Sequence, residues 1–147
     1  MKKLITFNQN LGKKLSKLES LPLLLFRLVL AYGFYGPAMM KLKNIDGIIS
    51  WFTDMGMPMP ALNAYMATAT ESLGVLFLIL GFSTRIISVP LIVVMLVAIK
   101  TVHLANGFES GNNGFEIPLY YIFMLFALFI YGPGKYSLDY LLSKKVR

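Results

Sequence analysis

The fold is decided by residues 86–105, which read IISVPLIVVMLVAIKTVHLA. Lys100 and His103 are the only ionisable side chains among these 20 residues. A helix needs roughly 20 predominantly apolar residues to cross a bilayer whose hydrocarbon core is about 30 Å thick. The stretch therefore predicts a membrane-spanning helix that carries two ionisable side chains toward one of its ends.

Three further apolar stretches accompany this one, at residues 21–40, 61–80 and 117–131. The last is the shortest of the four. A tight turn joins the stretch ending at residue 80 to the one beginning at residue 86, and short connections make neighbouring helices antiparallel. We therefore expect an all-α fold, an integral membrane four-helix bundle of two helical hairpins, spanning residues 21–142.

The composition excludes a soluble enzyme. Of the 147 residues, 56% are hydrophobic and 14% are charged, and the mean hydropathy is +0.65. The formal net charge is +7, but the basic residues gather beside apolar segments. We therefore expect the lipid bilayer, and no nucleic acid, as the partner of these charges. The chain has no cysteine, which excludes disulfides, thiolate nucleophiles and cysteine-ligated clusters.

Lysine and arginine are unevenly divided between the two sides of the spans. Outside the spans, ten lie on one side: five before residue 21, Arg85, and four from Lys135 onward. Only Lys41 and Lys43 lie on the other side. The positive-inside rule then places both termini in the cytoplasm. Residues 143–147 form a short basic cytoplasmic tail in this interpretation.

Residues 1–20 predict an amphipathic helix ahead of the first span. Apolar residues recur every three or four positions, and lysines occupy the other faces: Leu4, Phe7, Leu11, Leu15 and Leu18 against Lys3, Lys13, Lys14 and Lys17. This pattern is typical of a helix that lies flat on the inner leaflet, and a solvated tail is the alternative. After the first span, an apolar cluster around Trp51 predicts a lid on the outer mouth of the bundle.

Ionisable side chains within the spans are informative because each is costly to bury in a bilayer. Helical rise puts Glu71 about 16 Å from the outer edge, with Arg27 within roughly 5 Å and Lys100 within roughly 7 Å of the same depth. We therefore expect Arg27 or Lys100 to pair with Glu71. Two interpretations stay open: the pair fastens the first hairpin, or Glu71 is a proton-exchanging carboxylate.

Lys100 and His103 are three residues apart, which puts them on one face of an α-helix. His103 is the single histidine and titrates near neutral pH, so it suits proton exchange with a small redox molecule, although a lone histidine is also a common packing residue. Glu116 opens the fourth span. Glu71, His103 and Glu116 lack the spacing of a metal site, and we expect no metal. A haem with two axial histidines would need His103 from each chain of a homodimer.

The sequence resembles the DoxX family of small bacterial and archaeal four-helix membrane proteins over about residues 21–142. The matching features, in chain order, are Arg27, Gly36, Lys41, Glu71 with Gly74, GFSTR at 81–85, HLANGF at 103–108, GFE at 114–116 and GPGKYSLD at 132–139. The resemblance implies a multi-pass protein of the bacterial or archaeal cytoplasmic membrane and membrane redox work. The family shares its name with subunits of an archaeal thiosulfate:quinone oxidoreductase, but the missing cysteine argues against direct sulfur oxidation by this chain.

Our first functional hypothesis is a quinone or quinol site in the outer half of the bundle. Glu71, His103 and Glu116 would exchange protons there, while a second group of side chains would contact the ligand: Arg27, Lys41, Lys100, Tyr35 and Tyr120, with Phe34 and Tyr121 as further flanking rings. No intrinsic cofactor is expected, so electrons would pass through a partner oxidoreductase subunit.

Two alternatives stay open. The first is a non-enzymatic membrane anchor or assembly subunit for a partner oxidoreductase, in which the buried charges are structural. The second is a small-solute carrier, which four spans and the lack of a broken-helix pair disfavour unless the chain dimerises.

Overall fold

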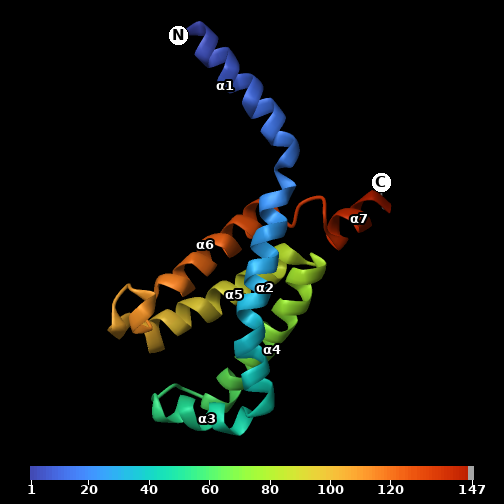
Figure 1. Ribbon diagram of the computed structural model, residues 1–147. Helices are drawn as coiled ribbons and strands as arrows, with labels where there is room; N and C mark the ends of the chain where they lie inside the picture. The colour runs from blue at the N-terminus through green and yellow to red at the C-terminus, as the bar shows by residue number, and fades with distance from the viewer. Residues whose placement is uncertain (146–147) are drawn as a thin grey trace.

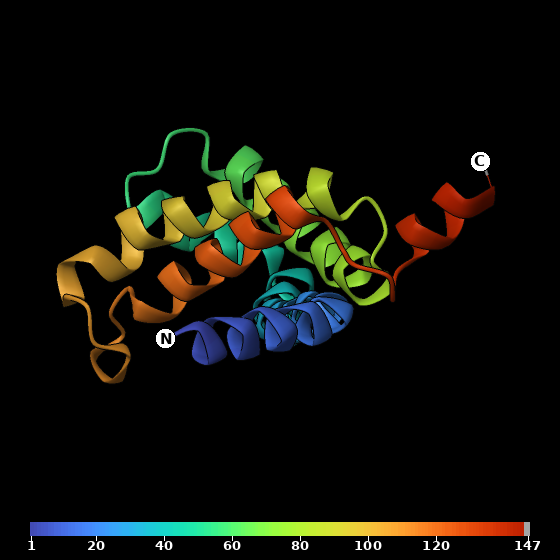
Figure 2. The same ribbon diagram turned by 90° about the horizontal axis from the view of Figure 1, so that it is seen from above.

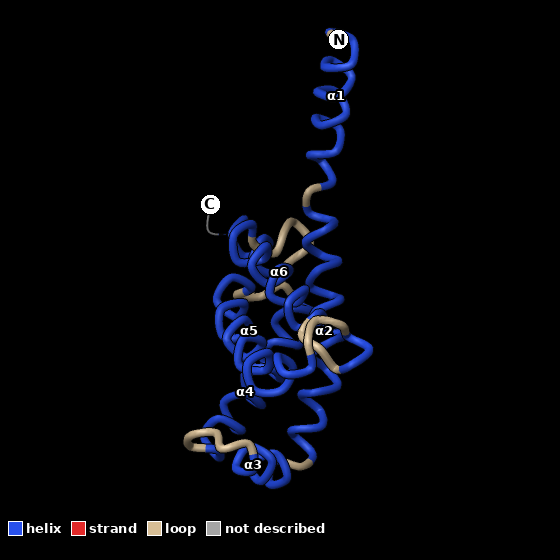
Figure 3. The backbone as a smooth tube through the Cα atoms, turned by 90° about the vertical axis from the view of Figure 1, so that its left-hand side faces the viewer, coloured by secondary structure: helices blue, strands red, loops and turns tan. Residues whose placement is uncertain are grey.

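Every regular element that the computed structural model contains in its described residues is a helix (Figure 3). The structure describes residues 1–145, apart from the side chains of residues 2, 5, 8, 10, 13, 14 and 17. The main apolar helices are α2 (Ser20–Lys43), α4 (Pro60–Leu80), α5 (Thr84–Ala98) and α6 (Glu116–Tyr131). The shorter elements are α1 (Lys2–Leu15), η1 (Ser16–Leu18), α3 (Ile45–Asp54), a π-helical segment η2 (Ile99–His103), η3 (Leu104–Asn106), η4 (Ser110–Asn112) and α7 (Leu138–Lys145).

Three helices within residues 1–145 are long and apolar enough to cross a membrane. They are α2, α4 and the continuous run of α5, η2 and η3 from Thr84 to Asn106. α6 is equally apolar but has 16 residues, so a count of four spans stays a prediction. Large apolar side chains, such as those of Ile86 and Phe123, are exposed on the outer faces of these helices, as expected of helices whose solvent is lipid.

The apolar helices pack in two pairs, α2 with α4 and α5 with α6, and contacts of α4 with α5 and of α2 with α6 complete the bundle (Figure 2). Their shared core is built from Leu30, Phe34, Leu78, Leu91, Leu125 and Leu128. Gly74 lets α4 approach α5 closely, because a Cβ at this position would lie 2.8 Å from Leu91 Cδ2. Small residues permit such close approach between membrane helices.

α3 lies across the end of the bundle that is opposite to the chain termini (Figure 1). The side chain of Asn44 caps this helix by accepting a 3.1 Å hydrogen bond from Gly47 N. Ile48 and Phe52 on its buried face pack against Ala64 near the start of α4. The predicted lid is therefore a short amphipathic helix held on α4.

α1 continues roughly in line with α2 and projects away from the bundle (Figures 1 and 3). The predicted apolar residues of this helix are all exposed: Leu4, Phe7, Leu11, Leu15 and Leu18. The side chains of Lys13, Lys14 and Lys17, which were predicted to form its basic faces, lie outside the described set, as do residues 146–147 of the predicted tail. A position on the membrane surface thus stays a prediction for α1.

Candidate functional site

The buried carboxylate of Glu71 is paired with Lys41, at the last turn of α2. Lys41 Nζ donates hydrogen bonds of 2.8 Å to Glu71 Oε2 and 3.1 Å to Oε1. The exposed fractions of Lys41 and Glu71 are 8% and 3%. This is the one ion pair within 4 Å that the described part of the chain contains, and it joins α2 to α4.

The prediction that Arg27 or Lys100 pairs with Glu71 is therefore wrong. It assumed that all spans begin and end at the same depth. Instead, Glu71 is about three turns into α4 and still lies within reach of the last turn of α2, so the two helices are offset along their axes. The flexible stem of Lys41 covers the remaining distance.

Arg27 lies toward the other end of α2, and its side chain is buried, with an exposed fraction of 1%. Its Nη2 donates a hydrogen bond to the carbonyl oxygen of Tyr136, and the carboxylate of Asp139 is the negative charge that acts on it. Gly81 leaves the room that the guanidinium fills, because a Cβ there would overlap Arg27 Nη1. Arg27 therefore links α2 to the segment after α6 and does not reach Glu71.

Asp139 completes this junction from the first turn of α7. Its Oδ1 accepts a 2.8 Å hydrogen bond from Ser83 N, and its Oδ2 accepts a 3.1 Å hydrogen bond from Thr84 N. These amides belong to the start of α5, where a carboxylate satisfies free N–H groups and interacts favourably with the helix dipole. Ser137 caps α7 by accepting a hydrogen bond from Tyr140 N at 3.2 Å.

A pocket of about 250 Å³ lies between α2, the end of α5 and the start of α6, on the same side of the bundle as α3. We call it the outer pocket. Its walls are mostly apolar, and the polar groups of His103, Ser110, Asn113 and Tyr121 interrupt them. Apolar walls with a few convergent polar groups are the usual lining of a ligand site.

His103 is held in one tautomer at the wall of the outer pocket. Its Nδ1 lies 2.8 Å from the carbonyl oxygen of Asn113, and because a carbonyl can only accept, Nδ1 carries the hydrogen. Nε2 of the neutral ring is then the free acceptor. His103 ends the π-helical segment η2, a rare backbone form that occurs often at functional sites.

Tyr121 faces the same pocket from α6. Its ring lies against Phe34, with centroids 5.6 Å apart and planes at 57°. Its hydroxyl lies directly over Gly33, because a Cβ at Gly33 would overlap it. The sequence had indicated Phe34 and Tyr121 only as flanking rings, and Gly33, opposite the hydroxyl, is the residue that permits this close approach.

The other predicted site residues lie outside the walls of the outer pocket. Glu116 accepts hydrogen bonds from Ser110 N at 3.1 Å and from the Tyr120 hydroxyl at 3.0 Å, so it holds the loop beside the pocket. Lys100 and Tyr35 are exposed.

The structure thus places predicted residues in the outer pocket, the Lys41–Glu71 pair and the Arg27 junction, and it leaves Lys100, Tyr35 and the bonded pair of Glu116 and Tyr120 outside all three. The shared cavity that we expected for Glu71, His103 and Glu116 is not formed. In the part of the chain that the structure describes, no group of three acidic or histidine side chains is arranged to hold a metal ion.

The fold and the distribution of apolar surface define a multi-pass, all-helical membrane protein whose spans contact the lipid bilayer. A model of the DoxX family matches residues 22–104, which is more than half of the chain. The chain belongs to the DoxX family, and this confirms the resemblance that its motifs indicated.

Two relatives give the comparison more detail. The chain is 30% identical over 130 residues to a protein of Haemophilus influenzae named "Uncharacterized protein", with 83% of each chain covered. It is 31% identical over 93 residues to a protein of Bacillus subtilis named "Putative oxidoreductase CatD", with 63% of this chain and 67% of the relative covered. No solved structure matches the chain.

Proposed function

We propose that the outer pocket binds a quinone, a quinol or a similar small apolar redox molecule. The observation that carries the proposal is that His103, Tyr121 and Phe34 line one pocket of about 250 Å³ within the membrane-spanning helices. A flat ring with two oxygens needs apolar walls and a polar group at each end. Phe34 offers an aromatic face, and the imidazole and the phenol offer the polar groups.

The fixed tautomer of His103 supports a role in proton exchange. With Nδ1 donating to Asn113, neutral Nε2 can accept a proton from a quinol hydroxyl, and the protonated ring can return it to a quinone oxygen. The Tyr121 hydroxyl can donate a hydrogen bond to the second oxygen. Reduction of a quinone takes up two electrons and two protons, so the electrons must come from a redox partner.

We infer that this partner is an oxidoreductase in the same membrane. The name of the Bacillus subtilis relative supports an association with redox chemistry. The lack of cysteine removes dithiol chemistry from this chain, which leaves binding, orientation and proton exchange as its contributions.

The quinone proposal is tested on protein purified in mild detergent. We expect a quinone to co-purify and added quinone to raise the melting temperature, because a ligand that binds only the folded state stabilises it. The rise should be lost in His103→Ala and reduced in Tyr121→Phe. Tyr120→Phe is the matched control, since Tyr120 bonds to Glu116 outside the pocket walls. Absence of both co-purified quinone and any stabilisation of the wild type would refute the proposal.

We also propose that the chain lies in the bacterial cytoplasmic membrane with both termini in the cytoplasm. The distribution of lysine and arginine supports this orientation. Because the chain has no cysteine, single replacements can be labelled one at a time. In intact cells, a membrane-impermeant thiol reagent should label Ser50→Cys, in α3, and spare Ser143→Cys, in α7, until the cells are opened. The reverse result would contradict the orientation.

A further inference from the structure

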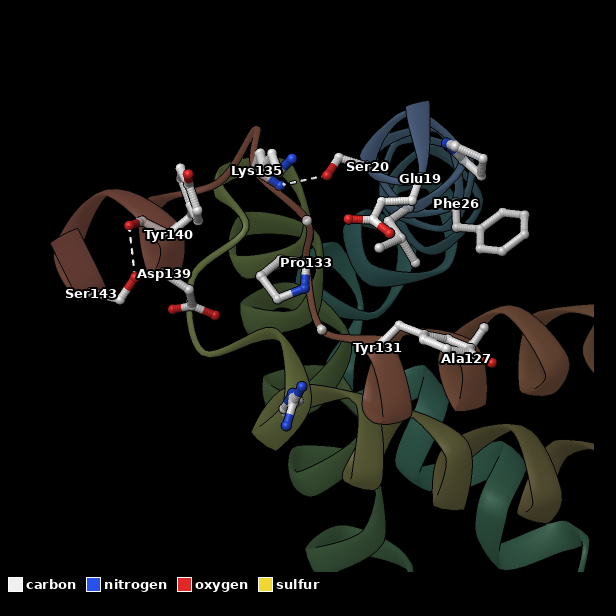
Figure 4. Close-up of a pocket in the computed structure, with 15 residues that line it drawn as sticks. Glu19, Ser20, Phe26, Ala127, Tyr131, Pro133, Lys135, Asp139, Tyr140 and Ser143 are labelled. Carbon is white, nitrogen blue, oxygen red and sulfur yellow. Dashed lines mark hydrogen bonds between the residues drawn. The ribbon is translucent and has the colours of Figure 1, made fainter. Parts of the chain in front are cut away.

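A larger cavity, of about 700 Å³, opens at the opposite end of the bundle from the outer pocket (Figure 4). It lies where α2 begins, where α6 ends and where the chain turns into α7. We call it the terminal groove. Its volume is within the range of roughly 300–1,000 Å³ that ligand sites occupy, and the quinone proposal makes no use of it.

The terminal groove has one apolar wall and one polar wall. Leu23 and Phe26 from membrane-spanning α2 and Ala127 and Tyr131 from apolar α6 form the apolar wall. In Figure 4, Glu19 and Phe26 on α2 lie above Ala127 and Tyr131 at the end of α6, and Lys135, Tyr140 and Asp139 lie to their left. An amphiphile fits such a site with its chain between α2 and α6 and its polar head at the turn.

Two cations line the polar wall. The Arg85 side chain lies against Gly132, where a Cβ would be 3.2 Å from Arg85 Nε and 3.4 Å from Nη2. Lys135 is held at the rim through its backbone, since Lys135 N donates a 3.1 Å hydrogen bond to Ser20 Oγ. Neither side chain has an acidic partner within 4 Å among residues 1–145.

Of the two acidic groups of the groove, Asp139 is already engaged outside it. Both oxygens of Asp139 already accept backbone hydrogen bonds from the start of α5, and the same carboxylate faces buried Arg27. Glu19 precedes the first turn of α2 and is exposed. Arg85 and Lys135 are therefore available to a ligand phosphate, beside the exposed carboxylate of Glu19, and a guanidinium suits a phosphate because it can donate two parallel hydrogen bonds.

We propose that the terminal groove binds one phospholipid of the leaflet on the side of the chain termini. Its phosphate lies between Arg85 and Lys135, and part of one acyl chain lies against Phe26 and Ala127. A basic pocket between membrane helices is a recurring form of phospholipid headgroup site. The apolar wall within the spans favours a membrane lipid over a soluble phosphate compound.

The test is native mass spectrometry of the full chain in mild detergent with added phosphatidylglycerol. The wild type should retain one phosphatidylglycerol, and diacylglycerol with the same acyl chains should bind much more weakly because it has no phosphate. Arg85→Gln and Lys135→Gln should each weaken phosphatidylglycerol binding about tenfold, the usual effect of losing one hydrogen bond to a charged group. Lys43→Gln, at the other end of the bundle, makes the same charge change and should have no effect.

A second variant keeps the test independent of charge. Ala127→Trp fills the apolar wall and should abolish retention of the lipid, while a melting curve without added lipid reports whether the fold is intact. Equal retention of diacylglycerol would overturn the proposal, as would equal weakening by Lys43→Gln. Full retention by Arg85→Gln, Lys135→Gln or a folded Ala127→Trp would overturn it as well. Because His103 and Tyr121 are untouched, these outcomes are independent of quinone binding.

Discussion

Removal of one member of the Lys41–Glu71 pair should destabilise the protein by about 3–5 kcal/mol, because it leaves the other charge buried without compensation. The two N–O distances, 2.8 and 3.1 Å, correspond to a Coulomb attraction of between about 5 and 6 kcal/mol at an effective dielectric constant of about 20. Desolvation of both groups offsets part of this attraction. Glu71→Leu and Lys41→Met are the single variants, and the double variant that combines them removes both charges.

The double variant should be far more stable than the sum of the two single losses predicts, because an apolar pair of similar volume replaces a buried ion pair at little cost. Unfolding by a denaturing detergent in mild micelles measures the free energies. The fluorescence of Trp51, the one tryptophan, reports the transition from α3. Lys43→Met is the control, because Lys43 is exposed two residues away, and it should change stability by less than about 0.5 kcal/mol.

The reasoning fails if either single variant loses less than about 1 kcal/mol, which is the ordinary value for an exposed ion pair. It also fails if the losses of the single variants simply add in the double variant, because additivity means that the two side chains do not interact in the folded protein.

Two further predictions concern close contacts between helices. Gly33→Ala should lower the stability of the protein by about 1–3 kcal/mol, because its methyl group overpacks against the Tyr121 hydroxyl. Gly36→Ala is the control and should not destabilise the protein, because a Cβ there meets nothing within 4 Å. Equal melting temperatures of the two variants would contradict the prediction. Asp139→Asn should lower the stability by about 1–3 kcal/mol, since it removes the charge that faces Arg27 and weakens the cap of α5; an unchanged melting temperature would show that the carboxylate charge is not needed.

The helices themselves were predictable from hydropathy. The apolar stretches at residues 21–40 and 61–80 correspond to α2 (Ser20–Lys43) and α4 (Pro60–Leu80), because a bilayer requires long apolar runs whatever the neighbouring helices are. The cap of α7 at Ser137 was also predictable, since capping depends on residues a few positions apart. Local rules therefore accounted for the elements and their ends.

The partners of the buried charges were not predictable in the same way. Assigning Arg27 to Glu71 required the relative depth of two helices, and the offset between α2 and α4 depends on packing that hydropathy does not report. The expectation for Lys100 and His103 used the α-helical repeat, but the chain forms a π-helical turn over Ile99–His103. A wider turn changes which side chains share a face, and Lys100 is exposed while His103 lines the outer pocket.

The hydrogen bond from Ser83 N to Asp139 joins two residues that are 56 positions apart in the sequence. During synthesis, the chain reaches the start of α5 long before the residue that caps it has left the ribosome. Until Asp139 has been made, the amides of Ser83 and Thr84 lack the carboxylate that accepts their hydrogen bonds. The cap of α5 therefore depends on a residue that is made long after the start of the helix, and a chain stopped before Asp139 leaves these two amides without that partner.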